Sequence, residues 1–319
     1  MLSVVIPFYN ESGNIPELFR RLDAVLSCHS PDYEVIGVDD GSRDDTFLRL
    51  LVEHEKNSRI KLVRLSRNFG KEIALSAGLQ HARGEAVVTM DADLQHPPEL
   101  IPEFLAHWRE GYKMVYAARQ SAQRETWLHT LFAKFFYWFF ARISQLELPK
   151  GAGDFRLLDR RVVDALNAMP ERTRFMKGLF AWVGFSQLGV PFVPPERFAG
   201  KSGFSLRRLW HFAIDGVAAF STVPLRVWSL LGLLISALSL VYGAFLVIRT
   251  LAFGIDVPGY ASLMVSTLFI GGIQLISLGV IGEYLGRVFE EVKRRPLYLV
   301  SETRGIDTDP THPGASASL

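Results

Sequence analysis

The residues best suited to chemistry in this 319-residue chain are Asp91 and Asp93, which end a short apolar run. A buried strand that ends in Asp-x-Asp places both acids at the carboxyl edge of a sheet, where open α/β folds bind ligands. Carboxylates this close repel each other unless a cation lies between them. Asp91, Asp93 and the Gln95 carbonyl are hard oxygen ligands and predict a Mg²⁺ or Mn²⁺ site completed by phosphates and water. The alternative is that Asp93 or His96 caps a helix starting near Pro98.

Composition narrows the class of protein. The net charge of +2 gives no support for nucleic-acid binding. Because Cys28 is the only cysteine, neither an internal disulfide nor a cysteine-based zinc site can form, and the catalytic part fits a reducing compartment. The first residues read as a strand, without the basic start and long apolar core of a signal peptide, so none is expected.

The elements that must position the acidic pair follow a regular alternation. Residues 2–118 alternate short apolar runs with longer amphipathic ones, which is typical of a mostly parallel sheet with covering helices. The expected strands are residues 2–7, 33–38, 60–65, 86–90 and 114–118. The expected helices are residues 15–26, 45–55, 71–81 and 98–110.

Polar residues also follow the first two expected strands. Asn10 and Glu11 come after the first, at the same sheet edge as the acidic pair, and can alternatively cap the next helix. Asp39 or Asp40 is placed to accept hydrogen bonds from a ribose or base edge, whereas the acids at 44–45 suit a helix cap. Since the Gly-x-Gly-x-x-Gly and P-loop motifs are absent, a nucleotide would bind through side chains and a metal.

Two apolar runs near the C-terminus, residues 227–248 and 257–282, carry no formal charge. Each exceeds the roughly 20 residues that a helix needs to cross a bilayer, and a buried soluble hairpin is the alternative. The short connector makes the two runs a hairpin with both outer ends on one side. Basic residues flank the pair, whereas the connector carries only Arg249. By the positive-inside rule, the N-terminal domain and the tail are cytoplasmic.

Four ordered stretches resemble a known family. They are Val5-Ile6-Pro7 with Asn10-Glu11, Val38-Asp39-Asp40-Gly41-Ser42-x-Asp44, Arg67-Asn68-Phe69-Gly70-Lys71, and Met90 through Pro98. In order and spacing they are similar to family-2 glycosyltransferases of the GT-A fold, and more closely to polyprenyl-phosphate glycosyltransferases such as dolichol-phosphate mannose synthase and the bactoprenol glucosyltransferases. The resemblance covers residues 2–204, and the hairpin that follows matches the bacterial branch.

The resemblance implies an α/β fold: a Rossmann-like GT-A sheet with flanking helices, then juxtamembrane amphipathic helices and a two-helix transmembrane hairpin. It also implies a bound nucleotide-diphosphate sugar. The residues expected around this donor are Pro7, Tyr9, Asn10, Glu11, Asp39, Asp40, Lys71, Asp91 and Ala92. A divalent ion at Asp91, Asp93 and Gln95 would neutralise the leaving nucleoside diphosphate, which makes Asp93 a catalytic residue. Lys71 adds positive charge with Arg67, although a solvated helix start accounts for Lys71 equally well.

Basic residues later in the chain are candidates for binding an acceptor phosphate. Arg119 ends the fifth strand and Arg124 follows it. Arginine suits bidentate contact with phosphate, and the family places acceptor-phosphate arginines here. A further stretch is similar to the family's Gly-x-Ser-Lys-aromatic motif, but Gly203 occupies the lysine position. Whether Lys201, Arg197 or neither contacts phosphate is therefore left open.

Residues 150–160 resemble the family's second catalytic motif, whose aspartate, here Asp154, faces the acceptor. A phosphate oxygen is already anionic at neutral pH, so a general base is less necessary than with an alcohol acceptor. Asp154 would then orient groups or tune Arg156, and both are expected to be catalytic. Asp159 and Arg160 equally well begin the next helix.

The remaining segments set the domain boundaries. Residues 127–146 are crowded with aromatic side chains and are expected in the headgroup layer, where they would guide a lipid acceptor; the alternative is a helix packed on the sheet. We expect a catalytic domain over residues 1–205 and a juxtamembrane amphipathic helix over 206–226. We expect a hairpin over 227–285 with spans 227–248 and 258–282, and a basic tail over 286–319. Residues 301–319 are expected to be disordered.

Together these features predict an inverting, metal-dependent glycosyltransferase that moves glucose from UDP-glucose to a polyprenyl phosphate such as undecaprenyl phosphate. The expected partners are the nucleotide sugar, the lipid phosphate and the bilayer of the bacterial inner membrane, without nucleic acid; a homo-oligomer is left open. Other donors remain open: GDP-mannose, UDP-N-acetylhexosamine or a UDP-aminoarabinose derivative. A processive synthase would need a wide channel and a Gln-x-x-Arg-Trp-type motif, which are not visible. A non-catalytic membrane scaffold leaves the acidic motifs unexplained.

Overall fold

The computed structural model describes residues 1–30, 32–119, 149, 151–169, 171–172, 174–193, 223–253 and 259–306. The chain divides into two compact units, Met1–Ala213 with Arg295–Leu319, and Ile214–Arg294. The predictions for Arg124, Arg197 and Lys201, for residues 127–146 and for the juxtamembrane helix up to residue 222 lie outside the described residues.

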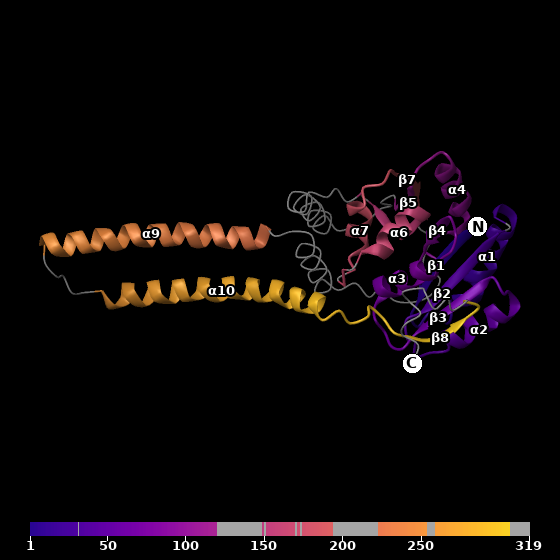
Figure 1. Cartoon of the computed structure of the whole chain (residues 1–319), viewed down its shortest axis with the longest axis horizontal. Coiled ribbons are helices and arrows are strands. Elements are labelled where there is room, and N and C mark those ends of the chain that lie inside the picture. Colours follow the sequence, from indigo (N-terminus) through magenta and orange to yellow (C-terminus); the bar gives the residue numbers. More distant parts are fainter. Residues whose placement is uncertain are drawn as a thin grey trace. The chain divides into compact units, whose positions relative to one another are not determined.

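The first unit is built on one mixed sheet (Figure 1). Its strands are β1 (Leu2–Phe8), β2 (Tyr33–Asp39), β3 (Ile60–Leu65), β4 (Ala86–Thr89), β5 (Met114–Arg119), β6 (Ala152–Asp159), β7 (Gln187–Phe192) and β8 (Val300–Arg304). The order across the sheet is β7-β5-β6-β4-β1-β2-β3-β8. Only β6 and β8 run antiparallel to their neighbours. The mostly parallel sheet predicted from the alternation is thus confirmed.

Helices cover both faces of this sheet. They are α1 (Ile15–His29), α2 (Thr46–Lys56), α3 (Lys71–His81), the 3₁₀ helix η1 (Pro98–Leu100), α4 (Ile101–Arg109), α6 (Arg160–Ala168) and α7 (Met176–Trp182). Val4 and Ile6 of β1 join a core with α1, α2 and α4, while Val5 faces α3 on the other side. The contact with α3 is close, because a Cβ on Gly78 would lie 2.2 Å from Val5 Cγ1. The central strands are therefore apolar on both faces.

The order of the strands creates a switch point beside β1. This strand pairs with β2 on one side and with β4 on the other, and all three are parallel. Phe8 lies opposite Asp39, and Val5 lies opposite Thr89. The segments that leave these strand ends carry Asn10 and Asp91 to the same edge of the sheet. Ligands of open α/β folds bind at such an edge.

The C-terminal strand β8 contradicts the expectation of disorder for the start of residues 301–319, and residues 307–319 lie outside the described residues. Val300–Arg304 pairs antiparallel with β3, and Ser66 donates its backbone N–H to the Leu299 carbonyl at 2.9 Å. Tyr298 is buried, and its hydroxyl donates a hydrogen bond to Gln80 of α3. An edge strand buries few side chains, so its sequence stays polar and resembles a tail.

The second unit contains two long helices, α9 (Val223–Phe253) and α10 (Tyr260–Val292), which run side by side (Figure 1). Each contains a segment long and apolar enough to cross a membrane, Val227–Phe245 and Ser262–Val292. Large apolar side chains such as Leu233 and Leu275 are exposed along them. The helix pattern predicted around residues 227–248 and 258–282 is present, and α10 continues past the expected span.

Candidate active site

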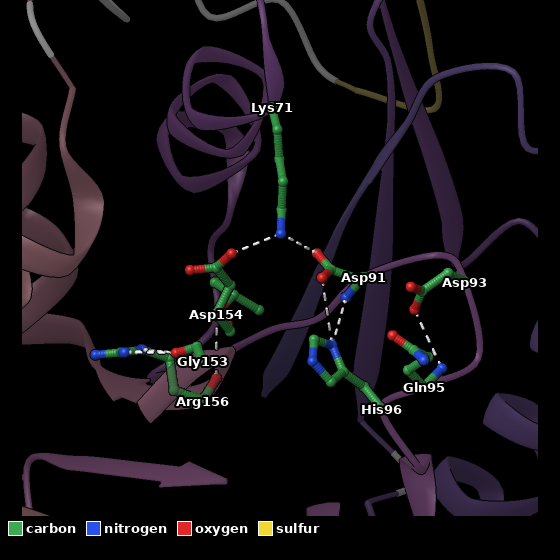
Figure 2. A network of polar contacts seen from close by, with 9 residues as sticks. Lys71, Asp91, Asp93, Gln95, His96, Gly153, Asp154 and Arg156 are labelled. Carbon is green, nitrogen blue, oxygen red and sulfur yellow. Dashed lines mark hydrogen bonds and ion pairs between the residues drawn. The ribbon is translucent and has the colours of Figure 1, made fainter. Parts of the chain in front are cut away.

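Three charged side chains meet at the carboxyl edge of the sheet (Figure 2). Lys71 Nζ lies 2.6 Å from Asp91 Oδ1 and 2.5 Å from Asp154 Oδ2. Asp91 follows β4, and Asp154 lies on the antiparallel β6, where Arg156 is opposite Thr89. The Thr89 hydroxyl donates a hydrogen bond to the Asp154 carbonyl at 2.5 Å, which holds the two strand ends together.

These charges stabilise one another's ionised forms. Burial disfavours the charge on Lys71, but the carboxylates of Asp154 and Asp91 outweigh it and raise the Lys71 pKa. Burial would raise the pKa of Asp154, yet the positive charges of Lys71 and Lys177 lower it to about 2. Burial and the charge of Asp154 raise the Glu72 pKa to about 8. At neutral pH Lys71 and Asp154 are therefore charged, whereas Glu72 is mostly protonated.

The loop after β4 is shaped by its own side chains. His96 Nδ1 accepts the backbone N–H of Asp91 at 3.0 Å, and Asp93 Oδ1 accepts the backbone N–H of Gln95 at 3.1 Å. Leu94 takes a left-handed conformation with φ of 61° between them. The loop thus turns back on itself, so that Asp91, Asp93 and Gln95 stand close together (Figure 2).

The helix-cap alternative for this loop is wrong. Pro97 is the N-cap residue of η1, and no side chain caps that helix. Asp93 and His96 are instead hydrogen-bonded within the loop. The His96 ring also stacks on Phe155 of β6 with ring centroids 5.1 Å apart, which fixes its orientation.

The donor atoms of this loop suit a divalent ion that also binds substrate. Within the part of the chain that the structure describes, no group of three or more His, Cys, Asp or Glu residues is arranged to hold a metal. Mg²⁺, however, is usually held by one or two carboxylates, with phosphates and water completing its shell. Asp91 and Asp93 supply those carboxylates, and the Asp91 oxygen already contacts a cationic group. The residues therefore fit such an ion.

Asp39, at the end of β2, has one carboxylate oxygen that could accept a hydrogen bond from a ligand. The residue is fully buried, and its Oδ1 accepts the backbone N–H of Ser42 at 3.1 Å. Its Oδ2 lies 3.4 Å from Arg64 Nε but accepts no hydrogen bond from the described residues. A buried acceptor without a donor is costly, so this oxygen suits a hydroxyl or N–H of a ligand.

Asp40, the other acid predicted to border a nucleotide, accepts hydrogen bonds from the loop that follows β3. Its two carboxylate oxygens accept the backbone N–H groups of Phe69 and Gly70 at 2.7 and 2.9 Å. The same loop packs closely on Gly41, where a Cβ would lie 2.5 Å from the backbone of Arg67 and where φ is +66°. Asp40 therefore fixes the loop that precedes Lys71, and Asp39 is the better candidate for contact with a nucleotide.

The loop after β1 is tied to the loop after β2. Asn10 Oδ1 accepts the backbone N–H of Arg43 at 2.9 Å, and Thr46 Oγ1 accepts the backbone N–H of Glu11 at 2.9 Å. Asn10 has a positive φ of 55°. Tyr9 is 41% exposed beside them. The structure thus brings Tyr9, Asn10 and Glu11, which were predicted to border the sugar donor, to one rim of the sheet.

The cap role considered for Asn10 and Glu11 falls to another residue, whereas the acids at 44–45 do lie at the start of α2, where Asp45 is the N-cap residue. Asn14, not Asn10 or Glu11, is the N-cap residue of α1. Asp44 accepts the backbone N–H of Thr46 at the start of α2, as one alternative expected. Among the other predicted donor residues, Pro7 lies within β1 and Ala92 is buried.

Arg119 and Arg156, the two described arginines predicted to act on the acceptor, differ in how exposed their side chains are. Arg119 is exposed at the end of β5, where its backbone N–H donates to the Gly151 carbonyl at 3.0 Å. Arg156 is 2% exposed, donates to the Gly153 carbonyl at 2.6 Å, and lies 3.9 Å from the centre of the Phe180 ring. Burial lowers its pKa to about 10. Arg156 thus supports the Asp154 segment from behind, whereas Arg119 can reach a ligand.

The sequence interpretation missed two charged residues of this site. Glu72 follows Lys71 in α3, where it reads as an ordinary first-turn acid. Lys177 is the second residue of α7, and its charge acts on both Asp154 and Glu72. No local pattern marks Lys177, because only the packing of α7 against the sheet brings it here. Asp159, by contrast, caps α6 through the backbone N–H of Arg161, as the helix-start alternative expected.

Comparisons with known proteins agree with this arrangement. Residues 3–166 match the family described as glycosyl transferase family 2, and residues 223–288 match the GtrB C-terminal hairpin. The chain is 57% identical to an uncharacterized glycosyltransferase of Synechocystis over 96% of both chains. It is 41% identical to the SfII prophage-derived bactoprenol glucosyl transferase of Shigella flexneri, over 95% of this chain and 98% of that one.

The fold has counterparts among solved structures. The first unit is similar to glucosyl-3-phosphoglycerate synthase from Mycobacterium tuberculosis in complex with Mn²⁺, UDP and phosphoglyceric acid. The TM-score is 0.50 at 20% identity, covering 68% of this chain and 76% of that one, which shows a shared fold. Taken with the full-length relatives and the matched domain, these findings show that the chain belongs to glycosyl transferase family 2.

Proposed function

We propose that this family-2 glycosyltransferase transfers glucose from UDP-glucose to a polyprenyl phosphate, such as undecaprenyl phosphate, at the cytoplasmic face of a bacterial inner membrane. The observation that carries the proposal is the 41% identity to bactoprenol glucosyl transferases over 95% of this chain. The cluster of Lys71 with Asp91 and Asp154 supports it, because the lysine and a divalent ion held by the acids would supply the positive charge that a sugar diphosphate needs.

The donor would lie across the switch point. Asp39 Oδ2 would accept a hydrogen bond from the nucleoside, and the loop of Tyr9, Asn10 and Glu11 would border it. Lys71 would face the diphosphate, since its ammonium already lies between Asp91 and Asp154. A divalent ion held by Asp91, Asp93 and Gln95 would act as a Lewis acid on the leaving diphosphate.

The acceptor would approach from the side of β5 and β6. Arg119 would bind its phosphate, and Asp154, supported by the buried Arg156, would orient it. A phosphate oxygen would attack the anomeric carbon while the bond to the UDP oxygen breaks. Attack opposite the leaving group inverts the configuration, so an α-linked donor gives a β-linked lipid phosphate sugar, without a covalent enzyme intermediate.

The helical hairpin would anchor the enzyme in the bilayer. Helices α9 and α10 contain segments that are long and apolar enough to span it, and the matched GtrB hairpin covers both. An acceptor with a polyprenyl tail stays in the membrane, so anchoring raises the rate of encounter with the active site.

The test is transfer of radiolabel from UDP-glucose to undecaprenyl phosphate by membranes that contain the protein, with and without EDTA. We expect label in the lipid phase that EDTA abolishes and added Mg²⁺ or Mn²⁺ restores. A panel containing GDP-mannose, UDP-N-acetylhexosamine and a UDP-aminoarabinose donor then tests the sugar. Transfer from one of these donors and not from UDP-glucose would overturn the choice of glucose, and no transfer from any donor would favour a scaffold.

A further inference from the structure

Lys71 is the cation that both acidic strand ends share. Its ammonium lies 2.6 Å from Asp91 and 2.5 Å from Asp154 (Figure 2). Asp91 lies in the loop that follows β4, and Asp154 lies in β6. The lysine itself comes from the first turn of α3, 83 residues before Asp154. One side chain therefore joins the proposed sugar-donor side and the proposed acceptor side of the rim into a single charged cluster.

The cluster depends on that positive charge. The side chains of Asp91 and Asp154 are only 26% and 14% exposed, and the buried Glu72 carboxyl lies near enough to be affected by the charge of Asp154. One oxygen each of Asp154 and Glu72 is buried without a hydrogen-bond partner among the described residues. Without Lys71, neighbouring carboxylates would repel each other with little water to screen them.

A divalent ion that binds Asp91 must compete with this ammonium for the same carboxylate. Lysine is well suited to such an exchange, because its charge sits on a flexible stem with four rotatable bonds. The Lys71 side chain is 42% exposed, so part of it borders solvent although its ammonium lies between two acids. A diphosphate that arrives with the ion offers the displaced ammonium new anionic partners, whereas a bare ion offers none.

Resting on the proposed function, we propose that Lys71 is a positioning residue that exchanges its Asp91 contact for the donor diphosphate when a divalent ion binds. The lysine keeps the two acids together before the donor arrives, and it opposes binding of the bare ion. Metal and nucleotide therefore bind cooperatively. Asp91 is fully available to the ion only when a diphosphate is present to pair with the Lys71 ammonium.

The test measures two affinities on the full-length protein in detergent micelles. Mn²⁺ binding without nucleotide is followed by electron paramagnetic resonance of the free ion, and UDP binding at saturating Mn²⁺ by calorimetry. For Lys71→Met we expect Mn²⁺ alone to bind about tenfold more tightly and UDP with Mn²⁺ about tenfold more weakly, since one unit charge is removed close to Asp91. A purely structural role for Lys71 would weaken both affinities.

Lys177→Met is the matched control. It removes a positive charge that also acts on Asp154, but within the described residues Asp91 pairs with Lys71 and His96 and not with Lys177. If it tightens Mn²⁺ binding as much as Lys71→Met does, a general field effect accounts for the result and the exchange is overturned. Lys71→Gln, which keeps hydrogen-bond donors near both acids, gives the deciding measurement if Lys71→Met does not fold.

The outcomes separate this inference from the proposed function. If the native protein binds Mn²⁺ with UDP and the Lys71 variants bind bare Mn²⁺ no more tightly, the exchange is wrong while the metal-dependent enzyme stands. If the native protein binds no Mn²⁺ with UDP present, both are wrong. Opposite changes in the two affinities, absent from Lys177→Met, support the exchange.

Discussion

His96 Nδ1 accepts the backbone N–H of Asp91, so an imidazole closes the loop that carries the acidic pair. The ring is held from its other side by Phe155. Residues that orient ligating side chains without touching the ligand commonly affect binding as strongly as the ligating residues do. His96 is therefore expected to govern the geometry of Asp91 and Asp93.

His96→Phe keeps the aromatic stacking but removes the nitrogen acceptor. We expect its transferase activity to fall by about tenfold to a hundredfold, because the backbone of Asp91 is no longer held in place. Steady-state transfer of radiolabelled glucose measures this. His107→Phe on α4, whose ring pairs with Glu110 at the surface, is the control and should retain activity. Equal activity in the two variants would show that the loop does not need His96.

Asp93→Asn removes one of the two proposed ion-binding carboxylates. We expect transfer to fall by about a hundredfold or more, as for the loss of one charge-stabilising group in other active sites. Asp164→Asn removes the same charge from the exposed face of α6 and should leave transfer unchanged. Full transfer by Asp93→Asn would make the metal assignment wrong.

Asp39→Asn changes the buried carboxylate whose Oδ2 accepts no hydrogen bond from the described residues. We expect KM for UDP-glucose to rise by about tenfold, because a hydrogen bond to a charged acceptor contributes roughly 1.5–3 kcal/mol. The effect on kcat should be smaller, since Asp39 does not adjoin Asp91 and Asp154. Initial-rate measurements over a range of donor concentrations separate the two constants. Asp32→Asn, at an exposed position, is the comparison.

Tyr298 makes the docking of the C-terminal segment sensitive to high pH. Burial raises its pKa from 10.0 to about 12, which means that the folded state favours the protonated phenol. Its contribution to stability is complete below pH 10 and is lost as the pH rises toward 12, by about 2 kcal/mol. Thermal unfolding of the native protein and of Tyr298→Phe, from pH 9 to 12, measures this: the gap in Tm between them should change with pH. A constant gap would exclude the effect.

Removing the C-terminal strand tests its contribution to the fold. A chain that ends at residue 297 lacks Tyr298 and β8, and so exposes the edge of β3. We expect a lower Tm and a tendency to aggregate, because an unpaired strand edge can pair with another molecule. A chain that ends at residue 306 keeps β8 and serves as the control. Equal Tm values and solubility would contradict the prediction.

Much of the fold was readable from local patterns. The strand Ile60–Leu65 and the helix Lys71–His81 lie where the sequence placed them, and the other elements expected over residues 2–118 differ by a few residues at their ends. Alternating apolar positions and helix-start signals act over short distances, so they survive without knowledge of the partner segments. The long apolar helices were equally predictable from local sequence. The polar strand β8 was not, because it is stabilised by pairing with β3, which is far away in sequence.

The candidate site also has a part that local sequence predicted and a part that only tertiary structure decided. Sequence alone determined that Asp91 and Asp93 follow one strand and that Asn10 and Asp39 lie at the ends of two others, because the end of a buried strand is a local feature. Tertiary structure decided that one buried oxygen of Asp39 accepts no hydrogen bond from the described residues while Asp40 holds a loop, and that Lys71 bridges Asp91 and Asp154. Those choices depend on strand pairing and helix packing between segments as much as 83 residues apart, and no local pattern records which side chains such packing brings together.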